Sequence, residues 1–128
     1  MSTRTRKKAA PRRSQAKSRA RKARARRGAK LPKSAVTLMV ILRAKEGQAT
    51  LLEAELRALV APTRREEGCL RFDLYRAADA PGAFFLHEVW ARREDHTRHT
   101  NMPHFLRWSA RKDAVLASRE SAFWTQIL

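Results

Sequence analysis

Hydrophobic residues after position 35 recur in short runs that predict alternating strands and helices. Val36 to Arg43 (VTLMVILR) is a nearly continuous apolar run rich in β-branched residues, as is typical of a strand buried on both faces. Gly47 then interrupts the chain, and from Gln48 to Arg64 leucines and a valine recur at helical spacing, at positions 52, 56, 59 and 60. These patterns predict a buried first strand followed by an amphipathic helix with one core-facing stripe.

A second strand is predicted from Cys69 to Arg76 (CLRFDLYR), where apolar and polar residues alternate strictly. The alternation places Leu70, Phe72 and Leu74 on one face and the residues between them on the other. Residues 77–82 contain Asp, Pro and Gly and form a loop short enough for a hairpin. We therefore expect Phe84 to Trp90 to be a third strand, antiparallel to the second.

The last third of the chain is predicted to be mostly helical before it ends in a strand. Arg92 to Lys112 has a helical composition but is interrupted at residues 101–103 (Asn-Met-Pro), which indicates two short helices that meet at a bend. Asp113 to Ser118 fits either the end of a helix or a loop. Ser121 to Leu128 (SAFWTQIL) is the expected fourth strand.

The order of these elements predicts an α+β fold. Strand, helix, strand, strand, helix, strand is the ferredoxin-like split βαβ plan, in which helices cover one face of an antiparallel sheet. A second copy is the simplest cover for the bare sheet face in so small a chain, so we expect a homodimer. The pattern leaves open whether Phe123 and Trp124 line a pocket or the dimer interface.

The charge distribution divides the chain into a basic segment, residues 1–34, and a domain, residues 35–128. The basic segment holds 15 of the 29 Lys and Arg residues and no acid, whereas the domain has 14 basic and 12 acidic residues. The net charge of +17 therefore arises almost wholly from the basic segment. Between Thr3 and Lys30 there is no Leu, Ile, Val, Met or aromatic residue, so we expect this segment to be disordered.

Nucleic acid or another polyanion is the expected partner of the basic segment. Each phosphate that Lys or Arg neutralises releases counterions, which gives affinity without sequence specificity. The composition resembles the basic tails of histone H1-like proteins. A solubilising role without a partner and an organellar transit peptide remain open alternatives. The expected contacts are the basic residues in the middle of the segment: Arg12, Arg13, Arg19, Arg21, Lys22, Arg24, Arg26 and Arg27.

The sequence also indicates in which cellular compartment the protein functions. No apolar run approaches the roughly 18 residues that a membrane span needs. The single cysteine, Cys69, cannot form an internal disulfide, which is compatible with a reducing compartment. We therefore expect a cytoplasmic protein that is not integral to a membrane.

Candidate chemistry is concentrated between Phe84 and Phe105, where a strand leads into a segment with three histidines. Strand parity places Glu88 and Trp90 together among apolar neighbours, where a carboxylate is expected to have a partner or a pKa raised by desolvation. His96 and His99 share a helix face, and one of them is a candidate general base because histidine titrates near neutral pH. We expect His96 to be a surface residue.

Other chemistries lack their sequence motifs. The chain has no HExxH or CxxC metal motif, no glycine-rich phosphate loop, no nucleophile elbow and no dinucleotide fingerprint. We therefore expect neither a metal nor an organic cofactor.

Four short motifs remain: Gly47 after a strand, Pro62-Thr63-Arg64 with Glu67-Gly68-Cys69-Leu70 at a helix end, Glu88-Val89-Trp90 at a strand end, and His99 with Pro103-His104-Phe105. Taken together, they resemble the antibiotic biosynthesis monooxygenase (ABM) domain family over residues 35–128. The resemblance implies a dimeric ferredoxin-like α+β barrel with a pocket between helices and sheet. It also implies oxidation of a small quinol or phenol by dioxygen, without metal or flavin, after a base deprotonates the substrate.

The resemblance also implies roles for individual residues. His99 is the candidate base, Trp90 a pocket wall and Glu88 an orienting partner. Heme-degrading members of the family resemble one another in an Asn on the first strand, which Val36 to Leu42 lacks, so quinol-type oxidation is favoured. The alternative is a non-catalytic dimeric module that the basic segment tethers to nucleic acid or another polyanion, since a fold does not by itself determine function.

Overall fold

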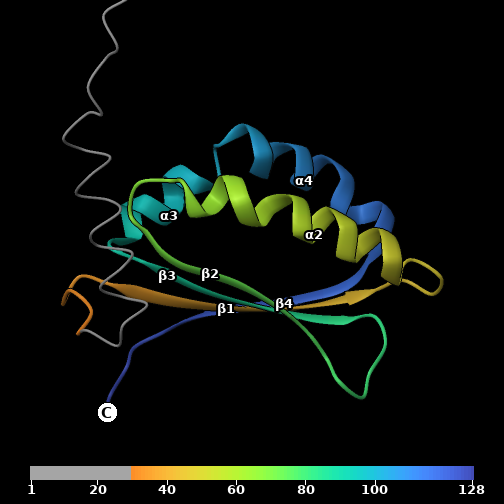
Figure 1. Cartoon of the computed structure of the whole chain (residues 1–128), viewed down its shortest axis with the longest axis horizontal. Helices are drawn as coiled ribbons and strands as arrows, with labels where there is room; N and C mark the ends of the chain where they lie inside the picture. The colour runs from red at the N-terminus through yellow and green to blue at the C-terminus, as the bar shows by residue number, and fades with distance from the viewer. Residues whose placement is uncertain (1–29) are drawn as a thin grey trace, which may run out of the picture.

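The computed structural model describes residues 30–128, so the expected polyanion contacts between Arg12 and Arg27 lie outside the described residues. Within residues 30–128, four strands form one antiparallel sheet in the order β2-β3-β1-β4, and three helices lie on one of its faces (Figure 1). This confirms the ferredoxin-like α+β architecture. The elements are β1 (Val36–Ala44), α2 (Ala49–Arg64), β2 (Cys69–Arg76), β3 (Ala83–Trp90), α3 (Arg93–His99), α4 (Pro103–Val115) and β4 (Leu116–Trp124).

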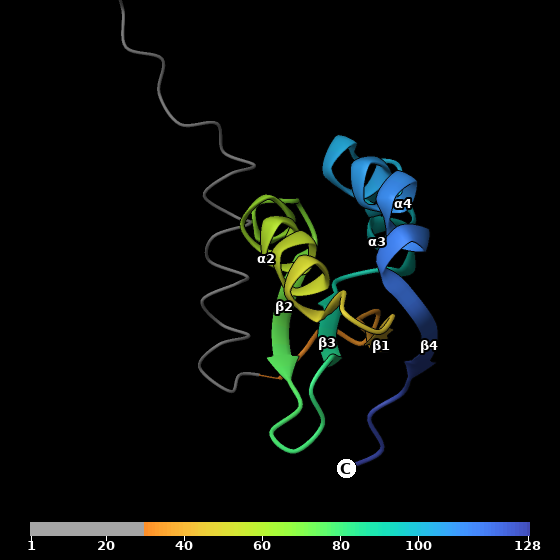
Figure 2. The same ribbon diagram turned by 90° about the vertical axis from the view of Figure 1, so that its right-hand side faces the viewer.

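The core lies between the helices and the inner face of the sheet. Figure 2 shows that α2 covers the β2 side of the sheet and α4 covers the β4 side. Leu52, Leu56 and Leu59 of α2 are buried, as their helical spacing predicts. They join one hydrophobic cluster with alternate residues of the strands and with Trp108 of α4. Burial of this periodic apolar surface is the main force that stabilises such a domain.

The first strand is buried on one face only, which corrects the expectation of burial on both. Leu38, Val40 and Leu42 face the helices and are buried, whereas Ile41 is exposed and Met39 half-buried. The second face of β1 belongs to the outer face of the sheet, which no element of the described chain covers (Figure 1). The apolar run is continuous because both faces of β1 are apolar, but only the face toward the helices is buried.

A β-bulge at Leu70 breaks the predicted alternation of β2. Cys69 pairs with Trp90 and Arg71 with Val89, so Leu70 is an extra residue between two successive pairs. Cys69 consequently joins the main core, and Leu70 packs with Val89 in a separate small cluster. The prediction that Leu70 shares a face with Phe72 was therefore wrong.

The bend between the last two helices is confirmed, but the fourth strand begins and ends earlier than predicted, at Leu116 and Trp124 instead of Ser121 and Leu128. Helix α4 runs to Val115 and β4 starts at Leu116, with no loop between them. Ser118 to Glu120 are exposed edge-strand residues without an apolar pattern, which explains why the pattern did not reveal this part of the strand. At its end, Phe123 packs against the core while Trp124 is exposed. No helix within residues 30–128 is long and apolar enough to cross a bilayer.

Candidate active site

The three residues singled out from the sequence lie together in the core beneath α3. Glu88 and Trp90 project from the inner face of β3, and His99 is the last residue of α3. The indole Nε1–H of Trp90 donates a hydrogen bond of 3.2 Å to Glu88 Oε1. The rings of Trp90 and His99 are in contact, with 4.8 Å between their centroids. All three side chains are buried, and His99 is 2% exposed.

A fourth residue, Glu66, organises the histidines. It lies just after α2, is buried, and its Oε2 is 2.6 Å from Nδ1 of His99 and 2.8 Å from Nε2 of His104. An ionised carboxylate can only accept, so each histidine presents an N–H to the same oxygen. In neutral His99 the proton is then on Nδ1, which leaves Nε2 as the basic nitrogen. We call Glu66, His99 and His104 the Glu–His–His triad.

Aromatic rings enclose His99 on several sides. Its ring centroid lies 5.0 Å from that of Phe105 and 5.8 Å from that of Phe72, in addition to the contact with Trp90. Phe72 is buried in β2 and Phe105 is half-buried in α4. Water is therefore largely excluded around the imidazole, which strengthens its hydrogen bond to Glu66.

Glu88 has the raised pKa that its sequence context predicted. Burial raises the pKa of this carboxyl, because desolvation disfavours the charged form. His99, when it is protonated, and the hydrogen bond from Trp90 act in the opposite direction and are the smaller effects. Glu88 is thus a carboxyl group that holds a proton more readily than one in water.

His96 is not the plain surface residue that we expected. It is half-buried, and its ring meets Trp90 edge-on at 5.8 Å and Phe123 edge-on at 5.2 Å. Burial lowers the pKa of His96 to about 4, and repulsion from His99, when that ring is protonated, and from Arg93 adds to the effect. His96 is therefore neutral at physiological pH and is a weaker base than a solvent-exposed histidine.

The Glu–His–His triad contains the residue types of a metal site, and its ligand atoms all lie within 4.8 Å of one another. Tetrahedral bonds of about 2.1 Å would place ligand atoms ~3.4 Å apart. Each histidine nitrogen here lies closer than that to Glu66 Oε2, at hydrogen-bonding distance. The described arrangement is thus a directly hydrogen-bonded triad, and a metal would have to separate its members.

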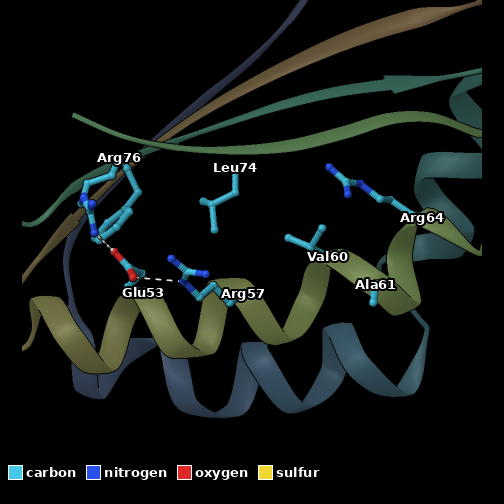
Figure 3. Close-up of a pocket in the computed structure, with 8 residues that line it drawn as sticks. Glu53, Arg57, Val60, Ala61, Arg64, Leu74 and Arg76 are labelled. Atoms are coloured by element: carbon cyan, nitrogen blue, oxygen red, sulfur yellow. Dashed lines mark hydrogen bonds and ion pairs between the residues drawn. The ribbon is translucent and has the colours of Figure 1, made fainter. Parts of the chain in front are cut away.

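A cleft lies elsewhere, between α2 and the edge strand β2, with a volume of about 570 Å³ (Figure 3). Neither His99 nor Glu88 nor Trp90 is among its lining residues.

The local sequence did not single out Glu66, because Glu66 and Glu67 are adjacent acids in a polar turn and only Glu66 is buried. The signal that distinguishes them is tertiary, since α3 and α4 supply the two histidines.

The domain matches known proteins over most of its length. Residues 35–111 match the family model described as antibiotic biosynthesis monooxygenase (ABM). PA3566 from Pseudomonas aeruginosa is 36% identical, with a TM-score of 0.73, and the match covers 75% of this chain and 97% of that one. The structure of Rv0793 from Mycobacterium tuberculosis is 28% identical, with a TM-score of 0.70, over 74% of this chain and 97% of that one.

Sequence comparison also matches Rv0793, whose name describes it as a candidate monooxygenase. The two sequences are 38% identical over 65 residues, which span 51% of this chain and 63% of that relative. The aligned stretch is thus shorter than two thirds of Rv0793. Family model, sequence and fold agree on one assignment. The chain belongs to the antibiotic biosynthesis monooxygenase family.

Proposed function

We propose that this protein is a monooxygenase that oxidises a small quinol or phenol with dioxygen, with His99 as the base. The observation that carries the proposal is the buried contact between His99 and Glu66, at 2.6 Å, within a cage of aromatic rings. A carboxylate that fixes one ring nitrogen of a histidine leaves the other as an oriented base. Family membership supports the oxygen chemistry.

In the proposed reaction Nε2 of His99 accepts the proton of the substrate hydroxyl. Glu66 stabilises the imidazolium that forms, because its carboxylate already accepts the Nδ1–H bond. The substrate anion is a stronger electron donor than the neutral quinol and reduces dioxygen directly. A quinol with a free ring C–H then yields a hydroxyquinone and water: one oxygen atom enters the ring, the other leaves as water, and the quinol supplies all four electrons. The reaction therefore balances without a separate reductant.

Because aromatic rings surround His99, a substrate can reach it only after part of the structure moves. At 2% exposure, its Nε2 can be reached only if one of the surrounding rings is displaced. Phe105 is the half-buried member of the cage, whereas Phe72 and Trp90 are fully buried. We therefore assign Phe105 as the ring that moves when substrate enters.

Oxygen consumption with a panel of substituted hydroquinones tests the proposal. His99→Gln should lower kcat by about 10²-fold or more, since a positioned base contributes roughly that much. His96→Gln is the matched control on the same helix and should retain most of the activity. Equal rates for the wild type and His99→Gln would remove His99 from the mechanism, and no oxygen consumption with any substrate would refute the assigned activity.

We further propose that the enzyme is a homodimer. The outer face of the sheet carries Met39, Ile41, Tyr75 and Phe85, and the rings of Tyr75 and Phe85 lie 5.7 Å apart. Ile41 and Tyr75 are exposed in the single chain, which is costly for clustered apolar side chains. Sedimentation analysis should give twice the monomer mass for the wild type and the monomer mass for Ile41→Lys; a monomeric wild type would refute the dimer.

A second candidate function, polyanion binding, depends on the 15 basic residues of the basic segment. Deletion of residues 1–34 should abolish a DNA affinity that falls steeply with salt concentration. Absence of DNA binding by the full chain at low salt would refute this function and would leave the oxidation proposal untouched.

A further inference from the structure

The cleft between α2 and β2 has an apolar floor and a cationic rim. Val60 of α2 and Leu74 of β2 face each other across its middle (Figure 3). Phe84 of β3 also lines the cleft and is buried. Arg57 and Arg76 lie at one end and Arg64 at the other (Figure 3). At about 570 Å³ the cleft has room for one or two fused rings.

The lining side chains carry an excess of positive charge. Three of the lining side chains are arginines and one is a carboxylate, Glu53, which accepts hydrogen bonds from Arg57 Nε at 3.0 Å and Arg76 Nη1 at 2.7 Å. A guanidinium has five N–H donors, so each of these arginines retains donors that Glu53 does not use. Both side chains reach solvent, with exposed fractions of 70% for Arg57 and 64% for Arg76.

The arginine at the other end is held in place. Arg64 Nε donates to the carbonyl oxygen of Phe72 at 2.9 Å, and its Nη2 donates to Asp73 Oδ1, also at 2.9 Å. These two bonds fix the plane of the guanidinium and leave Nη1 without a hydrogen bond in the described chain. Arg64 is thus paired with Asp73 and closes this end of the cleft, so the donors for a ligand carboxylate are those of Arg57 and Arg76 at the other end.

We propose that this cleft is a binding site for a small amphipathic anion, an aromatic carboxylate whose rings lie on Val60, Leu74 and Phe84. The carboxylate is bound by the free donors of Arg57 and Arg76, next to Glu53. A neutral aromatic compound would cover the floor but form no charge-assisted hydrogen bond with these donors, and a small inorganic anion would leave the apolar floor uncovered. The site does not depend on the proposed oxidation, because no member of the Glu–His–His triad lines the cleft.

Isothermal titration of the full-length protein with 2-naphthoate tests the site, with 2-naphthalenemethanol as the neutral probe. Arg57→Gln and Arg76→Gln should each weaken naphthoate binding at least about fivefold, because each removes a charge-assisted pair. Arg111→Gln is the matched control: Arg111 is 65% exposed and pairs with Glu55 of α2 at 3.1 Å, but it does not line the cleft. The measurements use 150 mM salt, and every variant retains the basic segment, so binding to that segment cancels in the comparison.

A second variant tests the cleft without removal of an arginine. Ala61 is an exposed lining residue on α2, and Ala61→Glu adds a carboxylate at the rim while it preserves helix propensity. Naphthoate should bind Ala61→Glu at least about fivefold more weakly than Arg111→Gln, and the neutral alcohol should bind the wild type at least about fivefold more weakly than naphthoate. Equal naphthoate affinity in the cleft variants and the control, equal affinity for the two probes, or no binding of naphthoate would each overturn the proposal.

Discussion

Replacement of Glu66 by alanine should destabilise the domain more than almost any other exchange of a polar residue. The carboxylate is the shared acceptor for buried N–H groups of His99 and His104, at 2.6 and 2.8 Å. Each buried donor left without a partner costs about 1–3 kcal/mol, so Glu66→Ala should lower the free energy of unfolding by about 2–6 kcal/mol. A domain of this size has about 5–15 kcal/mol in total, so the loss is a large fraction of it.

Urea unfolding at pH 7, followed by the fluorescence of the buried Trp90 and Trp108, measures this change. Glu66→Gln keeps one acceptor oxygen and should cost only about 1–2 kcal/mol, because neutral hydrogen bonds are weaker than those to a charge. Glu67→Ala removes the exposed neighbour and should change stability by less than about 0.5 kcal/mol. If Glu66→Ala and Glu67→Ala agreed within that margin, the triad would contribute nothing to stability and its assignment would be refuted.

Three further predictions concern single residues. Because burial raises the pKa of Glu88, its contribution to stability is fully present below the unfolded pKa of about 4.3 and is lost as pH rises through the folded pKa. The free energy of unfolding of Glu88→Gln, measured in urea, should therefore increase relative to that of the wild type between pH 4 and pH 8. A difference that stays constant over this range would contradict the raised pKa. Gly68 has φ +83°, and a Cβ added there would overlap the Asp95 side chain, so Gly68→Ala should lower the free energy of unfolding by about 2–4 kcal/mol. Gly47 has φ +74° but open space around it, so Gly47→Ala should lower it by only about 1–2 kcal/mol. Equal losses in the two variants would exclude the overlap. The imidazole of His96 should titrate near pH 4 when it is followed by NMR. The stability that His96 contributes should be present above its unfolded pKa of about 6.5 and be lost as pH falls toward 4. A titration midpoint between pH 6 and pH 7 would contradict its burial.

The fold was largely predictable from the sequence because most elements bury one face. Leucines at helical spacing identified α2, and the Pro103 bend separated α3 from α4. Two of the errors in the strands have the same cause. The bulge at Leu70 and the early start of β4 at Leu116 depend on pairing with neighbouring strands, and neither leaves an apolar period in the local sequence.

The candidate site was predictable only in part. Strand parity was sufficient to place Glu88 beside Trp90 and to expect a carboxyl with a raised pKa. It could not show that His96 packs against Phe123, or that Glu66 lies within reach of two histidines that follow it by 33 and 38 positions. Such contacts between separate segments arise from the packing of α3 and α4 on the loop after α2, which no short-range pattern contains.

The direct passage from α4 into β4 limits where this chain can accept added sequence. Val115 ends the helix, its carbonyl accepts the N–H of Lys45 at 2.8 Å, and Leu116 already belongs to the strand. One inserted residue there would shift β4 along β1 and exchange its two faces. Residues 78–81, in contrast, are exposed between β2 and β3 and pair with no other strand. An affinity tag or fluorescent label introduced at residues 78–81 should leave the sheet register intact, whereas the same insertion between Val115 and Leu116 should not.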